Sequence, residues 1–184
     1  SCHSFFPTKN LATFGDGGAI STNSKSLFSK MIKYREYGWG KNRNTEVLGI
    51  NSRLDEIHAY ILRYNLKNID NNINFRIKIA DYYFQNIKNS KILLPKKITN
   101  RKHSYHLFVI KLKNRNKLLK VLKKEGFFLG IHYKLPAHKQ KIYIENNLTL
   151  KNTENISNNS ISLPIYPGIE LNHLKKIIKI LNNF

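Results

Sequence analysis

The longest regular pattern in the chain is an apolar stripe between residues 53 and 87. Its members recur at three-, four- and occasionally five-residue steps, which is the spacing of one face of an α-helix. They are Ile57, Ile61, Tyr64, Ile69, Ile73, Ile77, Ala80, Phe84 and Ile87. No proline interrupts the stretch. We therefore expect a long helix over residues 53–87, with a kink near residues 65–68.

Three shorter segments show the same helical spacing. We expect a helix from about Asn23 or Ser24, which can cap it, to Tyr37, with Leu27, Phe28, Met31 and Ile32 on its apolar face. A second is expected over 116–125, ended by Gly126, with Leu118, Leu119 and Leu122 inward. A third covers 170–181, with Leu174, Ile177, Ile178 and Leu181 inward, and residues 139–144 form a short helical turn.

Strand-like segments lie between these helices. Residues 4–6 and 18–23 predict two strands around a glycine-rich turn, and residues 38–44 predict a loop. Residues 105–112 and 127–133 are rich in β-branched and aromatic residues, as strands are. Residues 161–165 predict an edge strand, because Pro164 cannot donate to a central ladder. The pattern is that of an α/β protein whose C-terminal part forms a small α/β unit.

The composition of the 184 residues is strongly basic, with a formal net charge of +21. Such a charge can indicate a nucleic-acid partner. The lysines are spread along the whole chain, however, and Asn and Ile are also abundant, which favours a compositional bias over specific nucleic-acid binding. The single cysteine, Cys2, cannot form an internal disulfide, which fits a reducing cytoplasm. We see no signal peptide and no apolar run long enough to span a membrane.

A lysine that could take part in covalent chemistry lies near the start of the chain. Lys9 lies in the segment Ser4–Leu11, and the glycine-rich segment Gly15–Ile20 follows. A desolvated lysine amine can form a Schiff base with an aldehyde, and the usual partner is pyridoxal 5'-phosphate (PLP). Ser4 offers a hydroxyl to a phosphate. From the motif alone, a lysine near glycines is also typical of a surface turn.

Six motifs in a fixed order narrow this choice. They are Ser4–Leu11 with Gly15–Ile20, Tyr37–Trp39, Asn51–Ala59, His106–Ile110, His132–His138 and Leu163–Gly168. Together they resemble the sugar-nucleotide aminotransferases of the DegT/DnrJ/EryC1/StrS family. The residues of these motifs are most similar to those of the branch that aminates C3 of a dTDP-linked 3-keto-6-deoxyhexose.

The resemblance implies the aspartate-aminotransferase-like fold, fold type I of the PLP-dependent transferases. We expect residues 1–52 to be the C-terminal portion of the PLP-binding large domain, 53–90 a long connecting helix, and 91–184 a small C-terminal α/β domain. In the family the cofactor lysine lies near the middle of the chain. These residues then resemble the C-terminal half of an enzyme whose other half carries the aspartate that pairs with the pyridine nitrogen. The family implies a homodimer with shared active sites.

The resemblance also implies an activity. It is PLP-dependent transamination of a nucleotide-linked keto-deoxysugar, with glutamate as the amino donor. Relatives that act as dehydratases carry histidine in place of the cofactor lysine, so Lys9 favours amination. Lys9 would bind the cofactor and then serve as general acid and base, because its freed amine stands beside the reacting carbon.

Further site residues follow from the motifs. Ser4 resembles the family's phosphate-binding hydroxyl, although it could be an ordinary strand-end serine. Asn51 matches an asparagine that reaches the cofactor phosphate of the neighbouring subunit, and it could also cap the helix expected from residue 53. Arg53 could hold an anion or a carboxylate, or form a structural ion pair with Asp55 or Glu56.

Sugar contacts are expected from the C-terminal part. His132 and Tyr133 match residues that approach the sugar, although they could instead be a packed strand end. Phe6 stands where related 3-aminotransferases often have tyrosine, which removes a candidate hydrogen bond and leaves the identity of the hexose open. We expect no metal site, because no pair among Cys2 and the histidines has the spacing of zinc ligands.

One rival hypothesis comes from another class of protein. The chain could be a non-catalytic basic binding module or an inactive gene fragment. If it is the C-terminal half of an aminotransferase, its long apolar stripe needs a partner that these residues do not contain. We then expect residues 1–184 alone to be aggregation-prone or only partly folded, and inactive as an aminotransferase, with the part from about Lys91 onward the best ordered.

Overall fold

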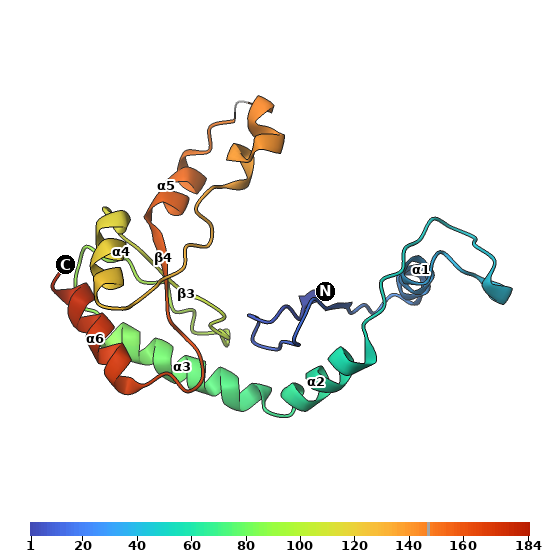
Figure 1. The fold of residues 1–184 in the computed structure, drawn as a ribbon, viewed down its shortest axis with the longest axis horizontal. Helices are drawn as coiled ribbons and strands as arrows, with labels where there is room; N and C mark the ends of the chain where they lie inside the picture. Colours follow the sequence, from blue (N-terminus) through green and yellow to red (C-terminus); the bar gives the residue numbers. More distant parts are fainter. Residues whose placement is uncertain (147) are drawn as a thin grey trace. The chain divides into compact units, whose positions relative to one another are not determined.

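A computed structural model describes residues 1–146 and 148–184 of the chain (Figure 1). They divide into two compact units, Ser1–Asp70 and Asn71–Phe184. Both contain helices and strands, so the prediction of an α/β protein is confirmed. The unit boundary falls inside the predicted connection 53–90. The domain limits 1–52, 53–90 and 91–184 stay predictions.

The N-terminal unit begins with two short paired strands. β1 (Cys2–Ser4) runs antiparallel to β2 (Gly18–Ile20), with Cys2 opposite Ile20. Three helical elements follow: α1 (Lys25–Arg35), the 3-10 turn η1 (Lys41–Arg43) and α2 (Glu56–Leu66). Ser24 caps α1, because its Oγ accepts a hydrogen bond from the Leu27 backbone N–H at 3.2 Å. The second strand and the first helix are therefore confirmed in shorter form, whereas the first strand ends at Ser4 and does not include Phe5 and Phe6.

The apolar faces of α1 and α2 are not covered within this unit. Helix α1 has no buried residue, and the Phe28 side chain is 56% exposed. In α2, Ile57 is 74% exposed, and Leu62 is the only buried hydrophobic side chain among residues 1–70, all of which the structure describes. An apolar surface of this kind marks an interaction site. The expected aggregation of the isolated chain stays a prediction that this surface favours.

The single long helix expected over residues 53–87 is wrong, although the kink within it is confirmed. The structure has α2 and then α3 (Ile69–Asn86), with Lys67 and Asn68 between them. The backbone N–H groups of these two residues bond three residues back, to Tyr64 and Asn65, at 3.3 and 3.1 Å. Such tightened bonds end the first helix, so the apolar stripe continues across two separate elements.

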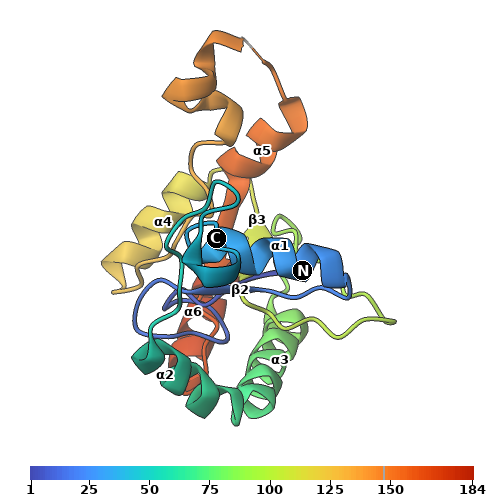
Figure 2. The same cartoon turned by 90° about the vertical axis from the view of Figure 1, so that its right-hand side faces the viewer.

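The C-terminal unit is built around one pair of strands. β3 (Phe108–Lys111) runs antiparallel to β4 (Ser160–Leu163), with Phe108 opposite Leu163. The other elements are α4 (Arg115–Lys124), η2 (Ala137–Lys139), η3 (Lys141–Asn146), α5 (Lys151–Asn159) and α6 (Leu171–Asn182). Figures 1 and 2 show α3, α4 and α6 around the β3–β4 pair. The helices predicted over 116–125 and 170–181 are confirmed as α4 and α6.

The hydrophobic core of the described chain lies in this unit. It includes Tyr83 of α3, Phe108 of β3, Leu118 and Leu122 of α4, Ile161 of β4, and Ile177 and Leu181 of α6, all fully buried. The rings of Tyr83 and Phe108 lie 5.0 Å apart between centroids. The end of α3 is also tied to α6, because the Asn182 amide donates to the Asn86 carbonyl at 2.9 Å. The second half of the apolar stripe is therefore buried inside this unit. This corrects the expectation that the whole stripe needs a partner outside these residues.

Three expectations for this unit need correction. The strand over 127–133 does not form, because only Gly130 pairs, in a single bridge to Ser162, and Phe128 is 79% exposed. The strand predicted at 161–165 forms as β4, but it lies between β3 and Gly130 and is fully buried. Pro164 follows its last paired residue and so leaves the ladder intact. The Asn-rich segment 151–159 forms α5, which we did not predict.

A buried arginine joins three parts of the C-terminal unit. Arg76 of α3 is 9% exposed, and burial lowers the pKa of its guanidinium. Its Nη1 donates to the backbone carbonyls of Tyr105, His106 and Ile165 at 3.2, 3.3 and 2.6 Å. The charge thus satisfies carbonyls that flank β3 and β4, and it stabilises them where no strand partner is present.

We expect Arg76→Ala to lower the free energy of unfolding by about 3 kcal/mol, because charged hydrogen bonds to two buried carbonyls and one partly buried carbonyl are lost. Urea unfolding followed by circular dichroism measures this. Lys78→Ala is the matched control, because Lys78 is exposed on the same helix and its contact to the Phe75 ring is worth less than about 1 kcal/mol. Equal stability of the two variants would show that Arg76 is not a structural anchor.

Candidate active site

Backbone hydrogen bonds hold Lys9 in a tight turn after β1. Its N–H donates to the Phe6 carbonyl at 2.8 Å. The Phe5 N–H donates to the Gly17 carbonyl at 2.8 Å, and the Thr13 N–H donates to the Phe5 carbonyl at 2.9 Å. The loop that carries the lysine is therefore fixed at both ends against the start of β2. The Lys9 side chain is half-buried.

Two glycines allow this close packing. A Cβ on Gly18 would stand 2.9 Å from the His3 backbone carbonyl oxygen, and one on Gly17 would stand 3.1 Å from the Leu54 side chain. A larger residue at position 18 would separate β1 from β2. The glycine-rich segment therefore keeps the turn of Lys9 close to the strand pair.

Several polar groups around this turn are available to a ligand. Among the described residues, no carboxylate lies within ion-pair distance of the Lys9 ammonium. The Ser4 Oγ accepts a long 3.5 Å bond from the Phe6 N–H, which leaves the serine proton free to donate. The Thr13 Oγ1 is buried and has no hydrogen-bond partner among the residues described. The turn thus presents the Lys9 amine and the Ser4 hydroxyl, groups that fit an aldehyde carrying a phosphate, whereas the Thr13 hydroxyl is buried beneath them.

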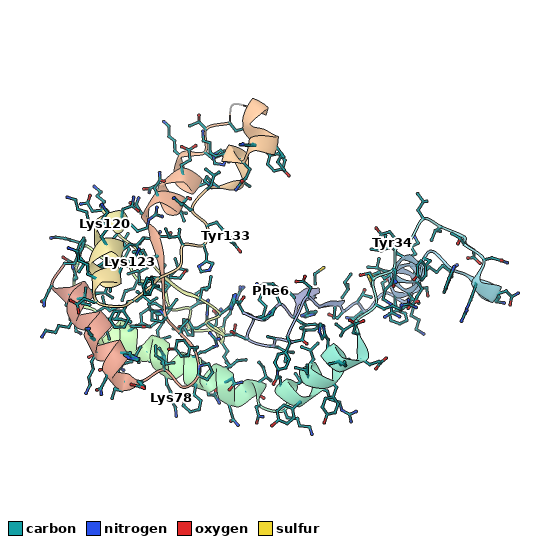
Figure 3. All side chains as sticks on the ribbon, viewed as in Figure 1. Phe6, Tyr34, Lys78, Lys120, Lys123 and Tyr133 are labelled. Atoms are coloured by element: carbon teal, nitrogen blue, oxygen red, sulfur yellow. The ribbon has the colours of Figure 1, made fainter. Side chains whose placement is uncertain are left out.

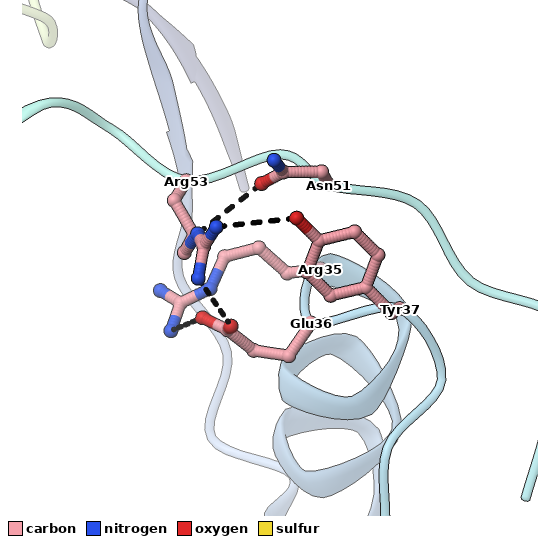
Figure 4. Close-up of polar contacts among 5 residues, drawn as sticks. All are labelled: Arg35, Glu36, Tyr37, Asn51 and Arg53. Atoms are coloured by element: carbon pink, nitrogen blue, oxygen red, sulfur yellow. Dashed lines mark hydrogen bonds and ion pairs between the residues drawn. The ribbon is translucent and has the colours of Figure 1, made fainter. Parts of the chain in front are cut away.

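A second polar cluster lies in the same unit, around Arg53 (Figure 4). The Arg53 guanidinium donates to Asn51 Oδ1 at 3.2 Å, to the Tyr37 hydroxyl oxygen at 3.3 Å and to Glu36 Oε2 at 3.5 Å. Arg35 donates to the other Glu36 oxygen at 3.1 Å. The guanidinium carbon also lies 5.5 Å from the centre of the Tyr37 ring. We call these five side chains the Arg53 cluster.

This cluster corrects two alternatives from the sequence. The ion pair of Arg53 is with Glu36, seventeen residues earlier, and not with Asp55 or Glu56. Asn51 does not cap α2, because the residue in the N-cap position is Asp55. Asn51 instead forms a backbone bridge with Glu36, which brings the segments 35–37 and 51–53 of the Arg53 cluster together.

Two glycines allow that backbone approach. Gly38 has a φ of +76°, in the left-handed region, directly after Tyr37. A Cβ on Gly49 would stand 2.1 Å from the Gly38 nitrogen. Only glycine fits at position 49, and its small size lets the segment that carries Asn51 lie against the segment that carries Tyr37.

The C-terminal unit holds the other predicted contacts, His132 and Tyr133. His132 Nδ1 lies 2.8 Å from the Oγ of Ser162 on β4. Tyr133, labelled in Figure 3, is 76% exposed, so the prediction of an accessible pair is favoured over a packed strand end. The Ser157 Oγ donates to the carbonyls of Tyr133 and Lys134 at 2.7 and 2.9 Å. β4 and α5 therefore hold this loop from its inner side.

The support from α5 could not be predicted from its sequence. The buried Arg115 of α4 donates to the carbonyl of Ser157 and, at 3.4 Å, to that of Ser160. His138 is also buried, with its Nε2 3.0 Å from Glu154 Oε1. These bonds join residues far apart in sequence, so only the fold shows that α5 anchors the loop of His132.

The predicted site residues are divided between the two units. Ser4 ends β1, Phe6 and Lys9 lie in the turn that follows it, and Asn51 and Arg53 lie in one cluster, all in the N-terminal unit. His132 and Tyr133 belong to the C-terminal unit. In the part of the chain that the structure describes, no three potential metal ligands gather, and no helix is long and apolar enough to cross a bilayer.

The whole pattern agrees with one family of proteins. The model of the DegT/DnrJ/EryC1/StrS aminotransferase family matches residues 1–182. The chain belongs to this family. The resemblance seen in the ordered motifs is therefore confirmed.

Curated proteins named as transaminases or aminotransferases of 3-amino sugars are similar to this chain. It is 37% identical to the dTDP-3-amino-3,6-dideoxy-alpha-D-galactopyranose transaminase of Aneurinibacillus thermoaerophilus, over 91% of this chain and 47% of that one. It is 32% identical to a UDP-N-acetyl-3-dehydro-alpha-D-glucosamine 3-aminotransferase of Acidithiobacillus ferrooxidans, over 98% and 49%. The chain thus spans about half the length of the curated relatives it matches.

Solved structures of sugar aminotransferases have the same fold. S. venezuelae DesV, in complex with a ketimine intermediate, matches with a TM-score of 0.93 and 30% identity, over 99% of this chain and 50% of that one. Bacillus subtilis NtdA with bound cofactor PMP matches with a TM-score of 0.91 and 28% identity, over 99% and 45%. The prediction of fold type I of the PLP-dependent transferases is confirmed.

The carboxyl group of Glu154 gives the site loop a pH dependence. The hydrogen bonds from His138 and from the Leu150 N–H lower the pKa of Glu154 below its ordinary value of 4.5. A lowered pKa means that the folded protein favours the carboxylate. Its contribution is complete above pH 4.5 and is lost as the pH falls through the lowered pKa.

We therefore expect the urea concentration at the midpoint of unfolding of the C-terminal unit to decrease when the pH is lowered below 4.5. The variant Glu154→Gln should show a smaller decrease. Circular dichroism between pH 6 and pH 3 measures it. Glu125→Gln is the matched control, because it removes another paired carboxylate, the partner of Lys176 at 2.9 Å. The same acid dependence in both variants would contradict the role of Glu154.

Proposed function

We propose that this chain carries the reactive lysine of a PLP-dependent aminotransferase that acts on a nucleotide-linked keto-deoxysugar. The substrate class we favour is a dTDP-3-keto-6-deoxyhexose aminated at C3, with glutamate as the amino donor. The observation that supports this most is Lys9 itself, half-buried, in a fixed turn and without a carboxylate partner among the described residues. The names of the relatives favour a 3-amino sugar.

Residues of the N-terminal unit would hold the cofactor. Lys9 would bind its aldehyde and the Ser4 hydroxyl would donate to its phosphate, while the Asn51 amide would donate to the cofactor phosphate of the neighbouring subunit. PLP supplies an electron sink when it is bound. The part of the protein in the chemistry is then to hold and move one proton, and the Lys9 amine, once free, is the group in this turn suited to that task.

We propose candidate substrate contacts in each unit by itself. His132 and Tyr133 offer hydrogen bonds to sugar hydroxyls, and Phe6, 45% exposed and labelled in Figure 3, offers an apolar surface. Arg53 carries a fixed positive charge for an anionic part of the substrate or cofactor. We further propose that the enzyme is a cytoplasmic homodimer, as the family resemblance implies.

The charge of the chain does not favour the rival binding module. Lys78 projects from α3, and Lys120 and Lys123 project from α4, as exposed side chains (Figure 3). Lysines on separate helices are typical of solvated faces. We therefore propose no specific nucleic-acid partner for the C-terminal unit.

The test of this proposal is Lys9→Ala in the protein that contains these 184 residues. We expect loss of the visible absorbance that PLP acquires on binding to a lysine, and a fall in glutamate-dependent amination by at least about 10²-fold, the scale of general acid–base catalysis. Spectrophotometry and product analysis measure the two effects. Lys25→Ala, on the exposed start of α1, is the control. Undiminished transamination by Lys9→Ala would contradict the proposal that Lys9 is the reactive lysine.

A further inference from the structure

The Arg53 cluster has a polarity that its hydrogen bonds determine. A guanidinium carries only donors, so every atom that faces it at hydrogen-bond distance must accept. Asn51 therefore presents its carbonyl oxygen Oδ1 to Arg53, at 3.2 Å, and Tyr37 presents the lone pairs of its hydroxyl, at 3.3 Å. Figure 4 shows both bonds reaching the same guanidinium.

The remaining hydrogens of both side chains then face elsewhere. Asn51 keeps its two amide hydrogens, and Tyr37 keeps its hydroxyl proton. Within residues 1–146 and 148–184, neither group donates a hydrogen bond in the structure. The two side chains are thus neighbours, through Arg53, whose donor hydrogens remain available to a ligand.

The charge of the cluster has the sign that suits an anion. Arg35 and Arg53 share a single carboxylate, that of Glu36, so the cluster is positive by one charge. Donors beside a net positive charge favour an oxyanion with several acceptor oxygens, and a phosphate group has this chemistry. A sugar hydroxyl does not need the charge.

We propose that Tyr37 and Asn51 donate together to one phosphate group, and that Arg53 is the positioning residue that turns both donors toward it. This inference rests on the proposed function, in which both the cofactor and the nucleotide-sugar carry phosphate. It adds the Tyr37 hydroxyl to the phosphate site, and it gives Arg53 a positioning role in addition to the positive charge that it supplies to the anion.

One substitution separates this role from a structural one. Asn51→Asp keeps an acceptor for Arg53 and strengthens that contact with a charge, but it removes both amide hydrogens and repels an anion. If the cluster only stabilises the fold, the variant is as stable as the native protein and binds ligands equally well. If the cluster binds phosphate, the variant folds but loses affinity.

The experiment uses the protein that contains this chain, freed of cofactor. Dissociation constants are measured for PLP, for pyridoxal, which lacks the phosphate, and for dTDP. We expect Tyr37→Phe to weaken the phosphate-bearing ligand by about 5- to 10-fold and Asn51→Asp by more than about 10-fold, with pyridoxal unchanged. Arg53→Lys keeps the charge but loses the planar fork, so its effect should match that of Tyr37→Phe.

Matched controls lie close by in the sequence. Tyr34→Phe removes an exposed hydroxyl from α1, and Asn44→Asp adds the same negative charge to an exposed position after η1. Both should leave all three affinities unchanged. Melting temperatures of all five variants show that each is folded.

The outcomes separate the inference from the function on which it rests. Loss of PLP affinity without loss of dTDP affinity assigns the cluster to the cofactor phosphate, and the reverse assigns it to the nucleotide, so either result supports the proposal. Native affinities in the Tyr37, Asn51 and Arg53 variants would overturn it. A native protein that binds none of the three probes would overturn the proposed function as well.

Discussion

The pairing of β3 with β4 is the interaction on which the C-terminal unit depends. All four residues of β4 are buried, and the helices α3, α4 and α6 contribute to the core around the pair. The same strand serves the candidate site, because Ser162 at its centre contacts His132. Arg76 then satisfies carbonyls just outside the two strands. A change in this pairing would therefore affect both the stability of the unit and the loop that carries His132 and Tyr133.

The N-terminal unit depends on close backbone approach instead of a large core. Gly18 lies against the carbonyl of His3, and Gly49 lies against Gly38, at distances that exclude a Cβ. The first approach holds the turn of Lys9, and the second assembles the Arg53 cluster. Both candidate ligand sites of this unit are thus built by loops, while its apolar helix faces remain exposed. This division between a packed unit and a unit of precise loops is consistent with a site whose surroundings lie partly outside these residues.

Elements held by contacts between residues close in sequence can be predicted from the sequence, whereas contacts between distant residues cannot. Helix α6 was predicted well, because its buried residues, among them Leu174 and Leu181, recur at helical spacing. Helix α5 was missed, because its Asn-rich sequence has little apolar periodicity and the bond from Arg115 spans 42 positions. The partner of Arg53 was misassigned for the same reason, since Glu36 approaches only through folding. The Lys9 motif was recognised through its family resemblance, and the chemical roles of its residues stay predictions.

The central claim is that Lys9 is the lysine that binds the cofactor. The most direct measurement is to add PLP to the protein that contains this chain, reduce it with borohydride so that any bond to an amine becomes permanent, and map the modified residue by peptide mass spectrometry. The account predicts one dominant pyridoxyl modification, on the peptide that carries Lys9. Modification of a different lysine at comparable occupancy, with Lys9 unlabelled, would contradict it.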